Sequence, residues 1–352
     1  MALNNIILIF FIIILGIFFN KYLLFFFKKI NTTLLLDDQF YKPQAFHENS
    51  VPRLGGIALY FSLATVFIYL FFLKNIFSLE YISFCSLFFI LGFIDDLKIN
   101  IAPKFRLIIM TMLLVVLISF GDVQIDRTGL KFLDNLFQID IFSFIFICLC
   151  FLFIINGSNL IDGFNGLLGI HSLIIFVTLT IINLMNENND ISFILLCISL
   201  LILVFIKFNF PKAQVFLGDG GAYLIGALIA ISVIQTSSLN PLISPFFFCI
   251  LLFYLFFEVL FSFFRKILIA RQNPLLPDNK HLHMLLYKLL FKKYRKNLKS
   301  NYMVSVYVNL IYFFLLAPAF FFMEDGLFCR YYFFGLIIFY IYCYKMLYKK
   351  VK

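Results

Sequence analysis

The sequence is poor in charge: only 13% of its 352 residues are Asp, Glu, Lys or Arg, and tryptophan is absent. Hydrophobic residues make up 63% of the chain, and the mean hydropathy is +1.02. A soluble domain is about half apolar and about a quarter charged. The composition therefore excludes an ordinary soluble protein and indicates an all-α membrane protein that crosses the bilayer many times.

The chain also lacks the short motifs of many soluble enzymes and metal proteins. It has seven cysteines, but none shows the C-x-x-C spacing of a zinc site, and all fall in or beside apolar segments. The sequence contains no Ser/His/Asp set, no P-loop and no Rossmann glycine pattern. We therefore expect the cysteines to be small core residues, and we look for the chemistry in the polar segments.

Long apolar runs define the membrane spans. A hydrocarbon core of about 30 Å takes roughly 20 apolar residues as a helix, which predicts about eleven spans in one integral-membrane domain over 1–352. The first span lacks a basic start and a cleavage site, so we interpret it as a retained helix rather than a signal peptide. The expected spans are 5–27, 54–73, 79–94, 104–120, 141–155, 166–185, 191–208, 221–236, 242–264, 303–323 and 327–348.

The net charge of +10 is distributed unevenly across these spans. If the N-terminus is outside, 23 of the 28 Lys and Arg residues fall in inner segments and four fall in outer ones. Cytoplasmic loops carry the positive excess, which predicts an N-terminus outside and a C-terminus in the cytoplasm. This orientation accounts for the basic charge without nucleic acid as a partner. It also places five polar clusters on the cytoplasmic face: 37–56, 95–106, 156–165, 209–220 and 278–283.

Two of these clusters are acidic. Asp95 and Asp96 end the third span in GFIDDLK (92–98), where paired charges at a bilayer edge are costly and indicate function. Asp219 follows a glycine at the start of the eighth span, in GDGG (218–221). An aspartate at a glycine-rich helix start can hold Mg²⁺ while backbone N–H groups face an anion. The purely structural alternatives are a solvated helix end for Asp95 and Asp96 and a helix cap for Asp219.

The segment NGSNLIDGFNGL (156–167) places Asn159, Asp162 and Asn165 three residues apart. If this segment is helical, a carboxylate and two amides lie on one rough face. Three of the four histidines and one arginine lie in two further loops, as His47, Arg53, His281 and His283. Without thiolate or Glu partners these histidines make a poor zinc site, and contact with phosphate suits them better, as it suits the planar guanidinium of Arg53.

Other features are expected to be structural. His171 lies inside the sixth span and is interpreted as a core residue, and Glu258 is expected to snorkel or to pair with Arg265 along one helix face. The stretch 285–299 predicts a basic amphipathic helix on the bilayer surface. The outer segment 121–140 predicts a hairpin or a surface helix.

Five motifs in order resemble the polyprenyl-phosphate sugar-1-phosphate transferases (glycosyltransferase family 4). They cover about 37–300 and are H-x-x-x-V-P-R-x-G-G (47–56), F-I-D-D-L-K (93–98), N-x-x-N-L-I-D-G-x-N-G-L (156–167), N-x-P-x-x-x-V-F-x-G-D-x-G (209–221) and P-D-x-x-H-x-H (277–283). The resemblance implies transfer of a sugar-1-phosphate, GlcNAc-1-phosphate by default, from a UDP-sugar to undecaprenyl phosphate with release of UMP. This would be an initiating step of cell-envelope glycan synthesis, such as lipopolysaccharide or O-antigen, at the bacterial inner membrane.

The resemblance also implies roles for individual residues. Asp219 would bind Mg²⁺, with Mn²⁺ as an alternative, and Asp95 and Asp96 would be catalytic residues near the lipid phosphate. Asn159, Asp162, Asn165 and Asn209 would line the nucleotide pocket, with Phe216 stacking on uracil. The remaining substrate-binding residues would be His47, Arg53, His281 and His283.

Departures from the family pattern help to place the chain within one branch of the family. Gln44-Ala45-Phe46 replaces a common basic pair, Asn279 replaces a frequent arginine, and Met284 stands where many relatives carry a further histidine. The D-x-x-H-x-H form and VPRLGG resemble the GlcNAc-transferase branch, with the phospho-MurNAc-pentapeptide translocase as the alternative. An ion-coupled transporter would need repeats and mid-membrane carboxylates, and a CDP-alcohol phosphotransferase would need residues that do not follow Asp162-Gly163. The sequence carries no signal of the oligomeric state or of the donor sugar.

Overall fold

The computed structural model describes residues 3–30, 33–38, 50–74, 79–99, 101–121, 123–125, 127–271, 273 and 278–351. Within these ranges the chain is a bundle of helices with one small pair of antiparallel strands. The elements are α1 (Leu3–Ile30), β1 (Leu36–Asp37), β2 (Val51–Pro52), α2 (Gly55–Lys74), α3 (Leu79–Asp96), α4 (Pro103–Phe120), α5 (Lys131–Leu136), α6 (Asp140–Ile161), α7 (Leu167–Met185), α8 (Asn189–Asn209), α9 (Gly218–Leu239), α10 (Pro245–Leu251), α11 (Phe253–Phe264), η1 (Arg265–Ala270), α12 (Leu282–Tyr294), α13 (Asn297–Phe321) and α14 (Gly326–Val351).

Every expected span has a helical counterpart in the described residues. In the part of the chain that the structure describes, nine helices are long and apolar enough to cross a membrane, and a bent pair could supply a tenth span. The helix α3 is not among them, because its 18 residues include Glu80, Asp95 and Asp96. The all-α polytopic class is confirmed.

The structure corrects three boundaries. The ninth expected span, 242–264, is bent by 74° between α10 and α11. The fifth span is longer than expected, because Asn156–Asn159 continue α6 to Ile161. The expected surface helix 285–299 ends earlier: α12 stops at Tyr294, and Arg295 adopts a left-handed conformation with φ 52° before α13 begins. The outer segment 121–140 contains the short helix α5, as predicted.

The helix α9 forms the centre of the bundle. Of an 18-residue stretch of α9, 78% is buried, against 17% in α4 and α14. Small residues allow helices in a membrane to approach closely, and here a Cβ on Gly92 of α3 would lie 2.4 Å from the carbonyl oxygen of Asp219. This contact places the acidic end of α3 against the first turn of α9.

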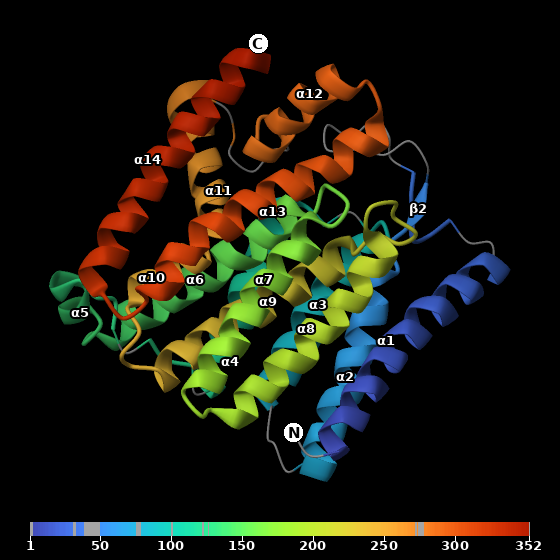
Figure 1. Ribbon diagram of the computed structural model, residues 1–352, viewed down its shortest axis with the longest axis horizontal. Helices are drawn as coiled ribbons and strands as arrows, with labels where there is room; N and C mark the ends of the chain where they lie inside the picture. Colours follow the sequence, from blue (N-terminus) through green and yellow to red (C-terminus); the bar gives the residue numbers. More distant parts are fainter. Residues whose placement is uncertain are drawn as a thin grey trace.

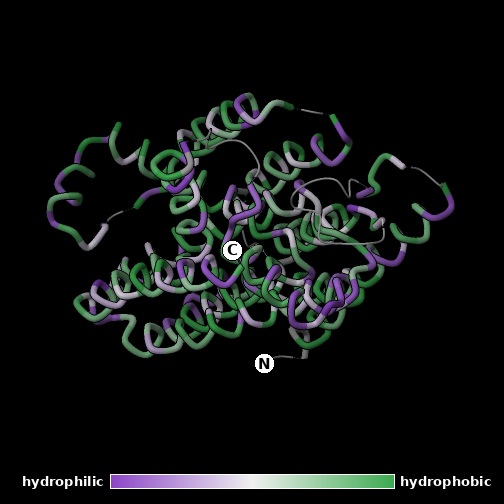
Figure 2. The backbone as a smooth tube through the Cα atoms, turned by 90° about the horizontal axis from the view of Figure 1, so that it is seen from above, coloured by the Kyte–Doolittle hydropathy of each residue, from purple (hydrophilic) through white to green (hydrophobic). Residues whose placement is uncertain are grey.

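The two termini lie at opposite ends of the bundle (Figure 1). The figure also shows α12 and β2 towards the end that carries the C-terminus and α5 towards the other end. Seen from above, most helices are hydrophobic along their length, and hydrophilic residues occupy shorter stretches (Figure 2).

Candidate functional site

The carboxylate of Asp96 caps the start of α9. Its oxygens accept the backbone N–H groups of Asp219 and Gly220 at 3.0 and 2.9 Å, and its side chain is only 3% exposed. Gly218 precedes them with φ 76°, and a Cβ there would lie 2.5 Å from Oδ2 of Asp96. The N–H groups expected to face a ligand anion are thus held by a carboxylate of the protein itself.

Arg53 connects this cap to the small sheet. Its guanidinium donates to Oδ1 of Asp96 at 3.3 Å and to Oδ2 of Asp37 at 2.9 Å, and Asp37 lies on β1. The backbone next to Arg53 is fixed as well, because Phe216 donates its N–H to the carbonyl of Pro52 at 2.9 Å. The described part of the cluster 37–56, through Asp37, Pro52 and Arg53, therefore meets the clusters 95–106 and 209–220, as the sequence predicts.

Arg106 is a site residue that the sequence reasoning missed. Its Nε lies 3.0 Å from Oδ2 of Asp95, and its Nη1 lies 3.6 Å from Oδ2 of Asp219 and 2.9 Å from the hydroxyl of Tyr223. The guanidinium thus separates two carboxylates that would otherwise repel each other. A signal was available, since Arg106 lies within the polar segment 95–106 on the first turns of an apolar helix.

Asp162 adds a fourth carboxylate to this region. It follows the last residue of α6, and Asn159 lies partly buried on the last turn. Burial and the charges of Asp219 and Asp96 raise the pKa of Asp162 well above its ordinary value. The helix ends before Asn165, so the three polar residues do not share one helical face as their spacing suggested.

Asn165 and Asn209 hold loops in place. The side chain of Asn165 donates to the carbonyl of Pro211 at 2.9 Å, and that of Asn209 accepts the N–H of Gly166 at 2.6 Å and donates to the carbonyl of Val215 at 2.9 Å. Both side chains are buried. Their observed bonds therefore join the segment 162–166 to the loop between α8 and α9.

The helix α13 supports the same segment with residues that the sequence reasoning did not single out. Asn301 accepts the N–H of Asn165 at 2.8 Å, and the hydroxyl of Ser305 donates to the carbonyl of Asn165 at 2.7 Å. Asn309 bonds to the carbonyl of Leu167 and to Nδ1 of His171, which confirms that His171 is a core residue. The spacing 301, 305, 309 is a polar stripe on one helix face and could have been recognised.

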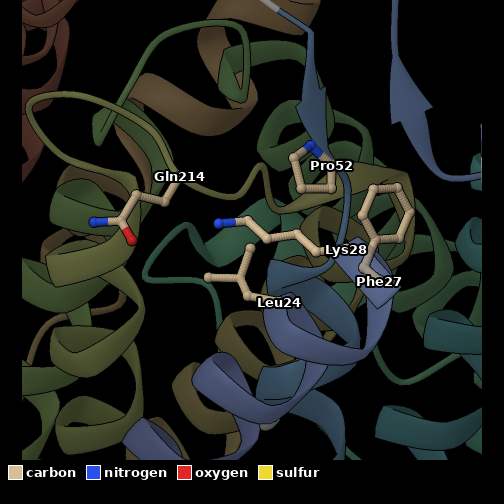
Figure 3. A pocket seen from close by; sticks show the side chains of 5 residues that line it. All are labelled: Leu24, Phe27, Lys28, Pro52 and Gln214. Carbon is tan, nitrogen blue, oxygen red and sulfur yellow. The ribbon is translucent and has the colours of Figure 1, made fainter. Parts of the chain in front are cut away.

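A cavity of about 280 Å³ lies beside β2 and is lined by Leu24, Phe27, Lys28, Pro52 and Gln214 (Figure 3). The amine of Lys28 points towards the amide of Gln214 across it. The acidic cluster, formed by Asp95, Asp96, Asp162 and Asp219, does not line this cavity. Phe216, which was expected to stack on uracil, is partly exposed in the same loop as Gln214.

The two histidines His281 and His283 lie side by side. Their rings are parallel within 3° with centroids 5.5 Å apart, and both are buried. Nδ1 of His281 lies 3.1 Å from Oε1 of Glu258, and Nδ1 of His283 lies 3.0 Å from the hydroxyl of Tyr254. Burial lowers the pKa of His283 to about 3, so this ring is neutral near pH 7.

The expected pairing of Glu258 with Arg265 is wrong. Glu258 is almost fully buried and binds His281, whereas Arg265 bonds to Asp278. The chain between Glu258 and Arg265 is helical, so the spacing is as expected, but the start of α12 occupies the carboxylate of Glu258 and Asp278 binds Arg265. His47 lies outside the described residues.

The acidic region has the donor chemistry for Mg²⁺. Among the described residues, no three His, Cys, Asp or Glu side chains converge on one metal position. Mg²⁺ commonly takes one or two carboxylates and completes its shell with water and substrate phosphates. Asp219, with a side chain 33% exposed in the first turn of α9, fits such a site.

Comparisons with known proteins agree with the sequence motifs. A family model described as glycosyl transferase family 4 matches residues 78–237. A Thermotoga maritima relative, named undecaprenyl-phosphate alpha-N-acetylglucosaminyl 1-phosphate transferase, is 27% identical over 67% of this chain and 68% of its own length. A Bacillus subtilis relative, named a probable undecaprenyl-phosphate N-acetylglucosaminyl 1-phosphate transferase, is 25% identical over 67% and 66%.

A relative of the other branch also matches. A Dictyoglomus thermophilum protein, named phospho-N-acetylmuramoyl-pentapeptide-transferase, is 32% identical over 65% of this chain and 74% of its own length. The chain therefore belongs to glycosyl transferase family 4, the polyprenyl-phosphate sugar-1-phosphate transferases that its five motifs indicate.

Proposed function

We propose that the protein transfers a sugar-1-phosphate from a UDP-sugar to undecaprenyl phosphate and releases UMP. The observation that carries this proposal is the acidic cluster, in which Asp95, Asp96 and Asp219 lie together with Arg53 and Arg106. The names of the relatives supply the acceptor and the reaction class. The Lys and Arg distribution favours a site that faces the cytoplasm of a bacterial cell.

In the proposed reaction an oxygen of the lipid phosphate attacks the β-phosphorus of the UDP-sugar. The bond between the β-phosphorus and the oxygen that bridges it to the α-phosphorus breaks, and UMP leaves with that oxygen. Such a transfer depends mainly on positioning and on neutralisation of the phosphate charges. We propose Arg53 and Arg106 for that neutralisation, because both lie within the acidic cluster. Bound Mg²⁺, held by Asp219, would supply further charge neutralisation.

The adjacent aspartates suit different tasks. Asp96 is nearly inaccessible and already accepts two backbone N–H groups and Arg53, so we assign it to holding the start of α9. Among the described residues Asp95 forms one ion pair, with Arg106. We therefore propose Asp95 as the carboxylate that acts near the lipid phosphate, and Asp162 and Asn159 as the wall towards the nucleotide.

We propose GlcNAc-1-phosphate as the default group transferred, because the D-x-x-H-x-H form lacks the third histidine of the translocase branch. The translocase reaction is the second candidate, and the 32% identity to the Dictyoglomus thermophilum relative favours it. Both reactions use the same acceptor and release UMP, so only the donor separates them.

A membrane assay tests the proposal. Membranes that contain the full chain are incubated with undecaprenyl phosphate and a panel of UDP-sugars, including UDP-MurNAc-pentapeptide, with and without Mg²⁺. We expect one donor to yield a lipid-linked sugar and UMP in a Mg²⁺-dependent manner, and Asp219→Asn to abolish both products. Asp190→Asn is the matched control, because Asp190 also lies in the first turn of a helix but is exposed away from the cluster. If no donor gives a product, or if Asp219→Asn retains activity, the proposal is wrong.

A further inference from the structure

Glu258 is a buried carboxylate in the bent segment α11. It is only 1% exposed, yet it receives three donors: the ring of His281 at 3.1 Å, the backbone N–H of Leu282 at 3.1 Å, and the hydroxyl of Tyr340. A carboxyl group that accepts bonds from three donors through its two oxygens is suited to the ionised form. Glu258 therefore joins three elements, α11, the start of α12 and α14.

Tyr340 brings the C-terminal helix into this arrangement. Its ring packs edge-on against Phe257 and Phe261 of α11, with centroids 5.0 and 5.2 Å apart. These contacts fix the ring independently of its hydroxyl. The hydroxyl therefore acts on Glu258 alone among the described residues, which makes its removal a small and specific change.

The bond to Glu258 defines the state of His281. An ionised carboxylate can only accept, so Nδ1 of His281 carries a proton and Nε2 points to the other side of the ring. Burial keeps His283 neutral near pH 7, and of the two stacked rings it is His281 that the carboxylate of Glu258 orients. Within the described part of the chain, nothing bonds to Nε2 of His281.

The histidine pair is linked to the acidic cluster through one short segment. Phe164 packs edge-on against His283 with centroids 5.8 Å apart, and it lies two residues after Asp162. The charges of Asp219 and Asp96 act on Asp162. The segment 162–164 therefore connects the carboxylates on one side to α12 on the other.

We propose that Glu258 and Tyr340 are positioning residues that hold His281 with Nε2 directed at a phosphate group of the substrates. This inference rests on the proposed transferase function and adds a role for α14. In metal sites, a carboxylate that accepts a bond from a histidine ring orients the ring and fixes its tautomer. Here the hydroxyl of Tyr340 in turn fixes the carboxylate.

The arrangement predicts which kinetic constant responds. A histidine that binds a phosphate group of the donor contributes to substrate binding, so a misdirected His281 raises the KM for the UDP-sugar. The hydroxyl of Tyr340 fixes one oxygen of Glu258, while the other oxygen accepts from His281 and Leu282. Tyr340→Phe therefore loosens the carboxylate and, through it, the ring of His281. Glu258→Gln keeps only one acceptor oxygen, so it should raise the KM as well.

The experiment compares full-length variants in membranes across a range of UDP-sugar concentrations. We expect Tyr340→Phe to raise the KM about tenfold and to leave kcat near that of the wild type. Tyr344→Phe is the matched control: Tyr344 lies one turn further along α14, and its buried hydroxyl has no partner among the described residues. This control should retain both kcat and KM.

The outcomes separate the two proposals. If the wild type makes no lipid-linked product from any donor, the transferase proposal fails and this inference with it. If the wild type is active and Asp219→Asn is not, but Tyr340→Phe keeps the KM of the wild type, only the positioning role is overturned. A loss of kcat in Tyr340→Phe with an unchanged KM also overturns it, because a merely structural defect lowers the amount of active enzyme and acts in that way.

Discussion

Asp96 holds the backbone of Asp219: the carboxylate at the end of α3 accepts the N–H groups of Asp219 and Gly220 at 3.0 and 2.9 Å. The position of the proposed metal ligand thus depends on a second aspartate 123 residues earlier in the chain. Charge-assisted bonds of this kind are stronger than bonds between neutral groups. The start of α9 is fixed by protein groups alone.

Asp96→Asn should therefore cost both stability and activity. An amide has one acceptor oxygen in place of two, so one backbone N–H at the start of α9 loses its partner. Arg53 also loses one of its negatively charged partners. We expect a loss of about 1.5–3 kcal/mol and a large loss of transfer. Thermal unfolding of the purified protein in detergent measures the first, and release of UMP measures the second. Equal stability of variant and wild type would contradict the account.

Gly218→Ala should disrupt the same cap, because Gly218 lies against the Asp96 carboxylate at the start of α9. Gly218 has φ 76°, which disfavours any residue with a Cβ, and the added carbon would lie 2.5 Å from Asp96. We expect a destabilisation of at least about 1–2 kcal/mol together with loss of activity. Gly335→Ala is the matched control, because a Cβ there meets nothing within 4 Å. The two variants should differ clearly in the midpoint of thermal unfolding.

Arg106→Gln should change the response to Mg²⁺. The guanidinium lies between Asp95 and Asp219 and competes with a cation for the same carboxylates. Without it we expect a lower midpoint of unfolding in EDTA and a larger stabilisation on addition of Mg²⁺, with half-saturation at a several-fold lower concentration. An unchanged Mg²⁺ titration would show that Arg106 and the metal do not share Asp219.

Asp162→Asn should stabilise the protein in the absence of metal while it impairs transfer. The pKa of Asp162 is raised by burial and by neighbouring carboxylates, so ionisation of this group opposes folding. The unfolded chain loses this proton near pH 4, and the folded chain loses it at higher pH, so stability falls as pH rises through that interval. The advantage of Asp162→Asn should therefore grow above about pH 4 and persist at neutral pH. Unfolding midpoints from pH 4 to 8 in EDTA test this.

Local residue patterns predicted most of the architecture. Every apolar run became a helix, and the paired Asp95 and Asp96 and the glycine-flanked Asp219 met at one end of the bundle. These features can be recognised in the sequence because each depends on a few neighbouring residues. The same locality explains why His171 was correctly interpreted as a core residue, and all seven cysteines are free, four of them buried.

The errors concern partners that only the three-dimensional fold brings together. Arg106 was counted as a loop charge because nothing in its neighbourhood indicates Asp219, 113 residues later. Glu258 was paired with Arg265 by helical spacing, but the start of α12 and Tyr340 of α14 occupy its carboxylate. The role of Asn165 in the nucleotide pocket stays a prediction, but nothing in its neighbourhood indicates that Asn301 and Ser305 of a distant helix bind its backbone.

The central claim is that a phosphoryl group moves together with the sugar, and a labelled donor tests it most directly. Membranes containing the full chain, with undecaprenyl phosphate and Mg²⁺, are given a UDP-sugar labelled with ³²P at the β-phosphate, for each donor of the panel. The account predicts that one donor transfers the label into the lipid fraction in step with unlabelled UMP release, and that Asp219→Asn transfers none. Label that remains in water-soluble UDP while the sugar enters the lipid would contradict it.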